Sequence, residues 1–450
     1  MRTAVLVVST EPVGARMAGP AIRAYELARA LAATCDVTLA APAPSTVADP
    51  RIGLVRAGMA DVEALVTAAR AQDVVVAQEL PPVVIERLAG GPARLVADLY
   101  NPIVIELLAG VADRPQRAQR RIQGRIVART LALCAAADLV ICANERQRDL
   151  WIGGLALSGL IDLAAHRRDP TLRSLVAVVP FGLPGGPAPA ATGALRAAFP
   201  AIAPGDRALI WGGGVWAWLD PLTPMRAIER LATQGGRPVH LVLLGVERPG
   251  LEASGQAAAG AAALAAARRA GLLGRLVHSN PGWVPYEERG AWLAEADVGV
   301  TAHRDQLEAR YAHRTRILDY LWAGLPVVAT RGDALAELVE HERLGAIAEP
   351  EDVTGFAAAC ERMLGSEGDG ARARVAALAP SLRWSEVAAP LVAWCEDAAA
   401  RPRRPLRRAV VRRAALTQYR WALSETLADE GGRAAAARVG RRLRRAVRLR

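Results

Sequence analysis

Short apolar runs rich in β-branched residues alternate with stretches of helical periodicity along most of the chain. The helical stretches, for example residues 21–33, lie between the apolar runs. This alternation is typical of parallel sheets covered by helices, because each strand is then buried on both faces. It predicts two series of strands and therefore two α/β domains. The expected strands are residues 4–8, 37–40, 74–77, 95–97, 139–142 and 175–179 in the first series, and 208–211, 239–244, 275–278, 298–301, 327–330 and 346–348 in the second.

Residues 180–205 separate the two series. Eleven of these 26 residues are Pro or Gly, a density at which neither a helix nor a strand is expected. Two similar domains joined in this way face each other across a cleft lined by the carboxyl ends of both sheets, where a ligand site is expected. The expected organisation is an N-terminal Rossmann-like domain (1–180), a linker (181–205), a C-terminal Rossmann-like domain (206–380), a helix packing back on the body (381–400) and an arginine-rich amphipathic tail (401–450).

The charge of the chain is concentrated in this tail. The net charge is +11, and all 56 basic residues are arginine; residues 401–450 hold 16 of them against three carboxylates, so residues 1–400 are close to neutral. Near the end Val439, Leu443 and Val447 recur every four residues among arginines, a pattern that suits an anionic membrane surface. A solvated basic tail and nucleic-acid binding are the alternatives, although the tail offers only Tyr419 and Trp421 for stacking on bases.

Cysteine usage and hydropathy indicate the compartment. The five cysteines are scattered without a C-x-x-C pair, which favours small buried residues in a reducing compartment over disulfides or a metal site. No apolar run reaches the roughly 18 residues of a membrane span, and the apolar start at residues 4–8 is too short for a signal peptide. We therefore expect a cytoplasmic protein bound peripherally to the inner face of the cell membrane.

Two glycine clusters stand between a strand and a helix. Gly19, followed by Pro20, begins a helix after the first strand, and its amides are candidates for an anion or hydroxyl cradle. Gly212, Gly213 and Gly214 follow the first strand of the second series, where the absence of side chains lets a diphosphate approach the backbone. Tight turns need the same residues, so each cluster alone is also consistent with a purely structural role.

The most informative stretch is residues 311–328, YAHRTRILDYLWAGLPVV. A helix opening near His313 directs free N–H groups at an anion. Asp319 lies one and a half turns further on, where its carboxylate can accept hydrogen bonds from a ribose diol. Gly324 and Pro326 end the helix before a buried strand.

This stretch resembles the C-terminal signature of the retaining glycosyltransferases of family four, which have the GT-B fold. The resemblance covers about residues 1–380 and includes the Gly19 loop. It implies that Gly213 and Gly214 contact the donor phosphates and that Trp283 lies where relatives present backbone to the base. It also implies that residues 73–79, with Glu79, and 96–101, with Asp98, form acceptor-side loops.

The chain departs from the family pattern at three places. Tyr311 stands where the family has its first Glu, which contacts the transferred sugar, and Asp319 replaces the second. Residues 213–220 contain no cation, whereas relatives hold the diphosphate there with Arg and Lys. Asp98 stands where many relatives have a cleft His, and it is a candidate to orient the sugar, act as a base or cap a helix. Because the leaving diphosphate gains negative charge, Arg314, Arg316 and Arg304 are the cations expected to compensate.

The sequence therefore predicts an enzyme that moves a sugar from a nucleoside diphosphate to a membrane-associated glycan or lipid acceptor, in the assembly of cell-envelope polysaccharide. The expected catalytic residues are Asp98 and Arg316, and no metal or cofactor is expected beyond the nucleotide sugar as co-substrate. Tyr311, Arg314 and Asp319 are expected at the donor, and Gly19 and Glu79 on the acceptor side. A nucleotide-sugar epimerase of the same fold and a non-catalytic partner in glycan assembly are the alternatives.

Overall fold

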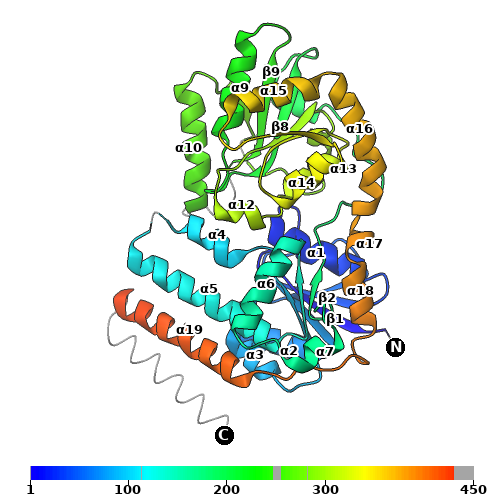
Figure 1. Cartoon of the computed structure of the whole chain (residues 1–450), viewed down its shortest axis with the longest axis vertical. Helices are drawn as coiled ribbons and strands as arrows, with labels where there is room; N and C mark the ends of the chain where they lie inside the picture. The colour runs from blue at the N-terminus through cyan, green and yellow to red at the C-terminus, as the bar shows by residue number, and fades with distance from the viewer. Residues whose placement is uncertain (1, 113, 247–254, 281, 430–450) are drawn as a thin grey trace.

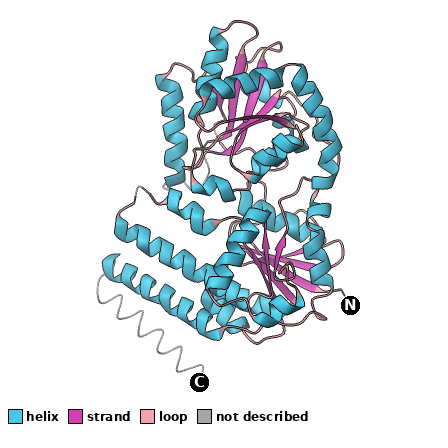
Figure 2. Cartoon of the chain, in the orientation of Figure 1, coloured by secondary structure: helices cyan, strands magenta, loops and turns pink. Residues whose placement is uncertain are grey.

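The computed structural model describes residues 2–112, 114–246, 255–280 and 282–429 of the chain. It contains two α/β domains, one above the other in Figure 1, and each is built on one parallel sheet covered by helices on both faces (Figure 2). Residues 430–450, which include the expected apolar stripe at Val439, Leu443 and Val447, lie outside the described residues.

The N-terminal domain contains a seven-stranded sheet in the order β3-β2-β1-β4-β5-β6-β7. Residues 52–56 form its edge strand β3, which sequence analysis does not predict. Gly53 interrupts the apolar run, and only Ile52 is buried, so the segment lacks the signal of a strand covered on both faces. The strands are β1 (Ala4–Val8), β2 (Asp36–Ala41), β3 (Ile52–Arg56), β4 (Val74–Ala77), β5 (Arg94–Asp98), β6 (Leu139–Cys142) and β7 (Val176–Val178).

The C-terminal domain contains a six-stranded sheet in the order β10-β9-β8-β11-β12-β13. Every strand pair in both sheets is parallel, so the carboxyl ends of the strands of each sheet share one edge. The strands are β8 (Arg207–Gly214), β9 (Val239–Gly245), β10 (Val277–Ser279), β11 (Val298–Thr301), β12 (Val327–Thr330) and β13 (Gly345–Ala348).

Helices connect the strands in both domains. The first, α1, begins at Gly19 with Pro20 in its first turn, as the sequence suggests, because proline lacks only an N–H that the first turn leaves unused. In the N-terminal domain the helices are α1 (Gly19–Leu31), α2 (Val62–Arg70), α3 (Pro82–Leu88), α4 (Ile103–Gly110), α5 (Gln116–Ala136), α6 (Glu145–Leu157) and α7 (Leu163–Arg168). In the C-terminal domain they are α9 (Leu222–Thr233), α10 (Gly255–Arg269), α11 (Arg289–Leu293), α12 (Leu307–Tyr311), α13 (Thr315–Trp322), α14 (Ala334–His341), α15 (Val353–Leu364) and α16 (Ser366–Leu378).

The segment between the two sheets contains a short helix, contrary to expectation. Residues 194–198 form the short helix α8 (Ala194–Ala198), which begins after Gly193 in the left-handed conformation. Leu195 of this helix is fully buried. Glu295 of the C-terminal domain accepts hydrogen bonds from the N–H groups of Leu195 and Arg196, at 3.2 and 3.3 Å. Burial and this carboxylate stabilise one helical turn that the local composition disfavours.

After α16 the chain returns to the N-terminal domain through η1 (Ala379–Leu382), α17 (Trp384–Val387) and α18 (Ala389–Glu396), on the right of Figure 1. Leu183 anchors this return, because its N–H donates to the Leu382 carbonyl at 2.7 Å and its carbonyl accepts from the Trp384 N–H at 3.0 Å. The last described helix, α19 (Arg408–Asp429), then packs on α5 and α3.

Two further expectations from the sequence concern the packing of the cysteines and the presence of membrane-spanning helices. All five cysteines are buried and free, in agreement with the expected packing role. None of the helices in the described part of the chain is both long and apolar enough to cross a membrane.

Candidate active site

A cavity of about 130 Å³ lies between the two domains, at the carboxyl ends of the strands. The C-terminal domain contributes the end of β8, the first half of α13 and the segment from Trp283 to Arg289. The N-terminal domain contributes the turn at the start of α1, the beginning of the linker contributes Gly182, and the return segment contributes Trp384. The cavity therefore lies where the sequence predicts an interdomain ligand site.

Strand β8 reaches the cavity through its glycines. The sequence predicts that the strand ends at residue 211 and that a loop follows, but the strand continues to Gly214, which pairs with Gly245 of β9 across an irregularity after Trp211. Gly213 adopts φ +74°, a left-handed conformation that glycine accepts without strain, as in bulges of this kind. A Cβ on Gly245 would lie 2.8 Å from the Gly213 carbonyl carbon, so the absence of side chains permits this approach.

Helix α13 is fixed against β8 by Tyr320. The Tyr320 hydroxyl accepts a hydrogen bond from the Gly212 N–H and donates one to the Val300 carbonyl, both at 2.8 Å. The ring occupies the space above Gly299, where a Cβ would lie 2.2 Å from Cγ of Tyr320. These contacts place Thr315, at the amino end of α13, against the cavity, where the helix dipole favours an anion.

Arg316, which lines the cavity, has a hydrogen-bond donor without an acceptor among the described residues. Its Nη2 donates to the Gly214 carbonyl at 2.7 Å, and its guanidinium lies 4.5 Å from the centre of the Trp211 ring. Nη1 is buried, and no described residue accepts a hydrogen bond from it. Burial lowers the pKa of Arg316 to about 10, so the side chain remains a cation at neutral pH. A buried cation with an unsatisfied donor is costly unless an anion binds it.

Asp319 is paired with an arginine that sequence analysis does not single out. Nε of Arg289 donates to Oδ1 of Asp319 at 3.1 Å, and Nη1 donates to the Tyr286 carbonyl at 2.5 Å. The guanidinium is stacked between two rings, 3.7 Å from the centre of Tyr286 and 4.8 Å from that of Trp322. These contacts fix the Asp319 carboxylate at the cavity wall.

The segment that carries Arg289 also contacts the N-terminal domain. The Tyr286 N–H donates to the Ala15 carbonyl at 2.7 Å, and the Tyr286 hydroxyl donates to Oε1 of Glu26 at 2.9 Å. Nε1 of Trp283 donates to the Met17 carbonyl at 3.1 Å. One segment therefore connects Asp319 to the turn and helix that form the opposite wall.

The structure brings together six of the ten predicted site residues. Those that line the cavity are Gly19, Gly213, Gly214, Trp283, Arg316 and Asp319. Asp98, Glu79, Tyr311 and Arg314 do not line it.

Asp98 lies in the core, because Nε of the fully buried Arg23 donates to both of its carboxylate oxygens, at 2.9 and 2.7 Å. Arg23 also donates to the carbonyls of Val179 and Pro180, so the pair holds the start of the linker against the sheet. Burial raises the pKa of Asp98, and Arg23 opposes this shift. The predicted catalytic side chain is thus satisfied internally, with a structural partner.

The other three predicted residues also form contacts with protein groups outside the cavity. Arg314 forms a buried two-bond ion pair with Glu308, at 2.9 and 2.5 Å. Glu79 pairs with Arg129 of α5. Tyr311 contributes its carbonyl, which accepts from Nε2 of Gln147 at 2.9 Å across the domain interface.

No group of three or more His, Cys, Asp or Glu side chains that could hold a metal ion occurs among the described residues.

Several aromatic side chains line the cavity, and sequence analysis identifies only Trp283 among them. The other aromatic lining residues are Phe181, Trp216, Tyr286 and Trp384.

Two parallel-sheet α/β domains around a shared cavity define the GT-B fold. Comparison with known proteins agrees: residues 220–366, in the domain that carries β8 and α13, match the family described as Glycosyl transferases group 1. A search of curated protein sequences gives no match.

Solved structures with this fold resemble the chain over most of its length. Sucrose-phosphate synthase from Thermosynechococcus elongatus is 18% identical with a TM-score of 0.60, and the match covers 89% of this chain and 100% of that chain. HepE from Anabaena, solved in complex with UDP and glucose, is 14% identical with a TM-score of 0.61 and coverages of 87% and 98%. WaaG, a glycosyltransferase involved in lipopolysaccharide biosynthesis, is 15% identical with a TM-score of 0.56 and coverages of 86% and 98%.

Proposed function

We propose that the chain is a glycosyltransferase that moves a sugar from a nucleoside diphosphate donor to a glycan or lipid acceptor at the inner face of the cell membrane. The observation that carries this proposal is the buried, unpartnered Nη1 of Arg316 beside the amino end of α13. A guanidinium donor, a helix amino end and glycine backbone together match the requirements of a diphosphate.

The proposed reaction breaks the bond between the anomeric carbon and the diphosphate, and the acceptor oxygen takes the place of the leaving group. Negative charge then develops on the departing diphosphate. Arg316 and the α13 amides oppose this charge in a site shielded from water, where such stabilisation is strongest. In this proposal Arg316 and the α13 amides supply the positive charge that a metal ion would otherwise provide.

Asp319 has a different role in the proposal. It is the only carboxylate among the described lining residues, and Arg289 holds its Oδ1. Its Oδ2 accepts no hydrogen bond from a described residue, so it is able to accept one from a ribose hydroxyl. The aromatic lining residues then contact the base and the apolar faces of the sugar.

The cavity in this structure is smaller than a typical small-molecule pocket. Small-molecule pockets span roughly 300–1,000 Å³, against about 130 Å³ here. Contacts through Trp283 and Tyr286 hold the two domains together. We infer that the domains separate to admit the donor and close again over it, which excludes water and limits donor hydrolysis.

Retention of the anomeric configuration, as in the family that the signature resembles, is part of the proposal, and so is a membrane-bound acceptor. The basic segment 401–450 supports the latter, because a surface that binds anionic lipid brings the cleft to a lipid-linked glycan.

The test is a screen of nucleoside diphosphate sugars with UDP-glucose as the first probe, read out by thermal shift and then by release of nucleoside diphosphate in the presence of a membrane extract. The proposal predicts stabilisation by one donor and release that depends on the extract. Conversion of the sugar without any acceptor would identify an epimerase instead. Stabilisation without turnover on any extract would identify a non-catalytic binding partner.

A further inference from the structure

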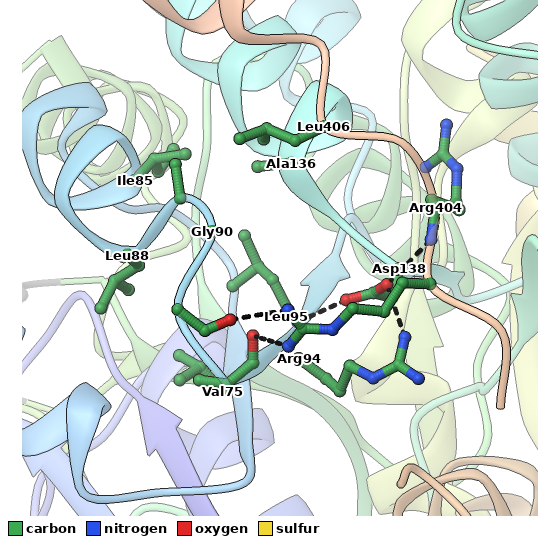
Figure 3. A pocket seen from close by; sticks show the side chains of 14 residues that line it. Val75, Ile85, Leu88, Gly90, Arg94, Leu95, Ala136, Asp138, Arg404 and Leu406 are labelled. Carbon is green, nitrogen blue, oxygen red and sulfur yellow. Dashed lines mark hydrogen bonds and ion pairs between the residues drawn. The ribbon is translucent and has the colours of Figure 1, made fainter. Parts of the chain in front are cut away.

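The segment that enters α19 is fixed to the N-terminal domain. Arg404 donates from its N–H to Oδ1 of Asp138 at 3.3 Å and from its guanidinium to the carbonyls of Ala137 and Leu160, both at 2.6 Å. Asp138 also pairs with Arg94 at 2.9 Å, as Figure 3 shows. Beside these contacts Leu406, together with Ile85 and Leu88, lines a small cavity of about 100 Å³ (Figure 3).

Helix α19 is docked along the flank of the same domain, antiparallel to α5 (Figure 1). Val411 and Ala414 are buried in the N-terminal core. Trp421 lies so close to α5 that a Cβ on Gly124 would be 2.9 Å from its Nε1. The described part of the basic tail is therefore a fixed surface element of the N-terminal domain.

The outward side of residues 408–423 of α19 is strongly basic. Residues 408–423 contain no acidic residue. Exposed positions recur three, four and eight residues apart, as on one helix face. These positions are Arg408, Ala409, Arg412, Arg413, Leu416 and Arg420.

The charges on this face are available to a partner. Arg412 lies 3.7 Å from Glu86 of α3, but Arg408, Arg413 and Arg420 form no ion pair with a described residue. Leu416 stands among them with 55% of its surface exposed. Neighbouring α5 contains no acidic residue and adds two exposed arginines, Arg117 and Arg120.

We propose that the outward face of α19, extended by Arg117 and Arg120 of α5, binds the anionic headgroups of a lipid bilayer. The arginines contact lipid phosphates and Leu416 enters the acyl boundary, a combination that suits an interfacial helix. A single-stranded nucleic acid is the less suitable partner, because none of the six exposed positions within residues 408–423 is aromatic and such binding relies on stacking.

This docking gives the two domains different roles. The N-terminal domain lies on the membrane through a fixed helix, whereas the C-terminal domain, at the other end of the molecule in Figure 1, stays free to open and close. The inference rests on the proposed function in one respect only: a lipid-linked acceptor is the reason for the cleft to be held at the bilayer.

The test is sedimentation of the full chain with phosphatidylcholine vesicles that contain or lack phosphatidylglycerol. We expect binding only to the anionic vesicles, weakening with salt. The double variant Arg413→Gln/Arg420→Gln should bind about 25-fold more weakly, since each arginine near such a surface contributes about fivefold. The matched control, Arg226→Gln/Arg230→Gln, removes two exposed arginines from α9 of the C-terminal domain and should bind like the wild type.

Wild-type affinity in the α19 variant, with its folding verified by thermal melting, would overturn the inference, because the binding surface would then lie elsewhere. Binding to a single-stranded oligonucleotide but not to vesicles would overturn it as well. Donor thermal shifts measured on the same variants separate the two proposals. A chain that binds anionic vesicles through α19 but no nucleotide sugar would refute the proposed function and leave this inference intact.

Discussion

Nε of Arg289 donates a hydrogen bond to Oδ1 of Asp319 over 3.1 Å. The arginine begins α11, whereas the aspartate lies in the middle of α13, thirty residues later. The same guanidinium stacks on Tyr286, and the Tyr286 hydroxyl donates a hydrogen bond to Glu26 of the N-terminal domain. The Arg289–Asp319 pair therefore connects the residue proposed to bind the ribose with a contact that holds the two domains together. Arg289 is thus a positioning residue in the account.

Arg289→Ala should raise KM for the donor about tenfold or more, because a charge-assisted hydrogen bond of about 1.5–3 kcal/mol is lost and Asp319 becomes free to turn away. Arg289→Lys should restore part of the loss, since a single donor to Oδ1 suffices. Steady-state kinetics on both variants check this, with Arg226→Ala on the exposed side of α9 as the control. Equal kinetics for Arg289→Ala and the wild type would remove Arg289 from the site.

Asp98→Asn should destabilise the fold and not merely slow a reaction. The substitution leaves the guanidinium of Arg23 buried without its counter-charge, a situation that costs about 3–5 kcal/mol. Urea unfolding of the variant measures this loss directly. If Asp98 were instead a catalytic group, the variant would keep wild-type stability and lose only turnover.

Glu106 should make stability depend on pH. Burial, reinforced by Glu308 across the domain interface and opposed by Arg314, raises its pKa from 4.5 to about 7. The folded protein then holds a proton that the unfolded chain releases, so the free energy of unfolding falls as pH rises from about 4.5 to about 7.

Glu106→Gln should remove this fall and stabilise the protein at pH 8 by on the order of 3 kcal/mol, with a smaller gain at pH 5. Thermal melts of both proteins across this range check the sign. A gain in stability that is larger at pH 5 than at pH 8 would contradict the raised pKa of Glu106.

Gly19→Ala and Gly182→Ala should separate binding from folding. Gly19 lines the cavity, and a Cβ there would have only the Tyr100 hydroxyl within 4 Å, at 3.8 Å, so the variant should melt like the wild type but bind the donor or acceptor more weakly. A Cβ on Gly182 would lie 2.6 Å from the Trp384 nitrogen, so that variant should lose stability. Melting curves and donor titrations on the pair check both expectations, and a strong loss of stability in Gly19→Ala would contradict the first.

The fold could be predicted from the sequence because buried parallel strands leave a strong apolar signal. Two elements are exceptions. Strand β3 contains Gly53 and is only partly buried at the edge of its sheet, and α8 forms in a segment rich in Pro and Gly because the Leu195 side chain is buried. Both depend on contacts with distant parts of the chain, which local composition does not contain.

The site was predictable only where the residues lie within a local motif. Gly213, Arg316 and Asp319 belong to such motifs and do line the cavity. Sequence spacing could not decide between Arg314 and Arg316. The two arginines flank Thr315 at the start of the helix, and the directions of their side chains follow from the fold: Arg314 pairs with Glu308, whereas Arg316 reaches Gly214. The partners Arg23 for Asp98 and Arg289 for Asp319 are set by the tertiary fold, and no motif marks them.

Isothermal titration of nucleoside diphosphates, beginning with UDP, into the wild type and Arg316→Gln will decide whether Arg316 holds the diphosphate. The wild type should bind one nucleotide at a single site, and the variant should bind it about 10- to 100-fold more weakly at unchanged melting temperature, because the donors of Arg316 contact the diphosphate. Equal affinity in both proteins would contradict the claim that the diphosphate is held between β8 and the beginning of α13.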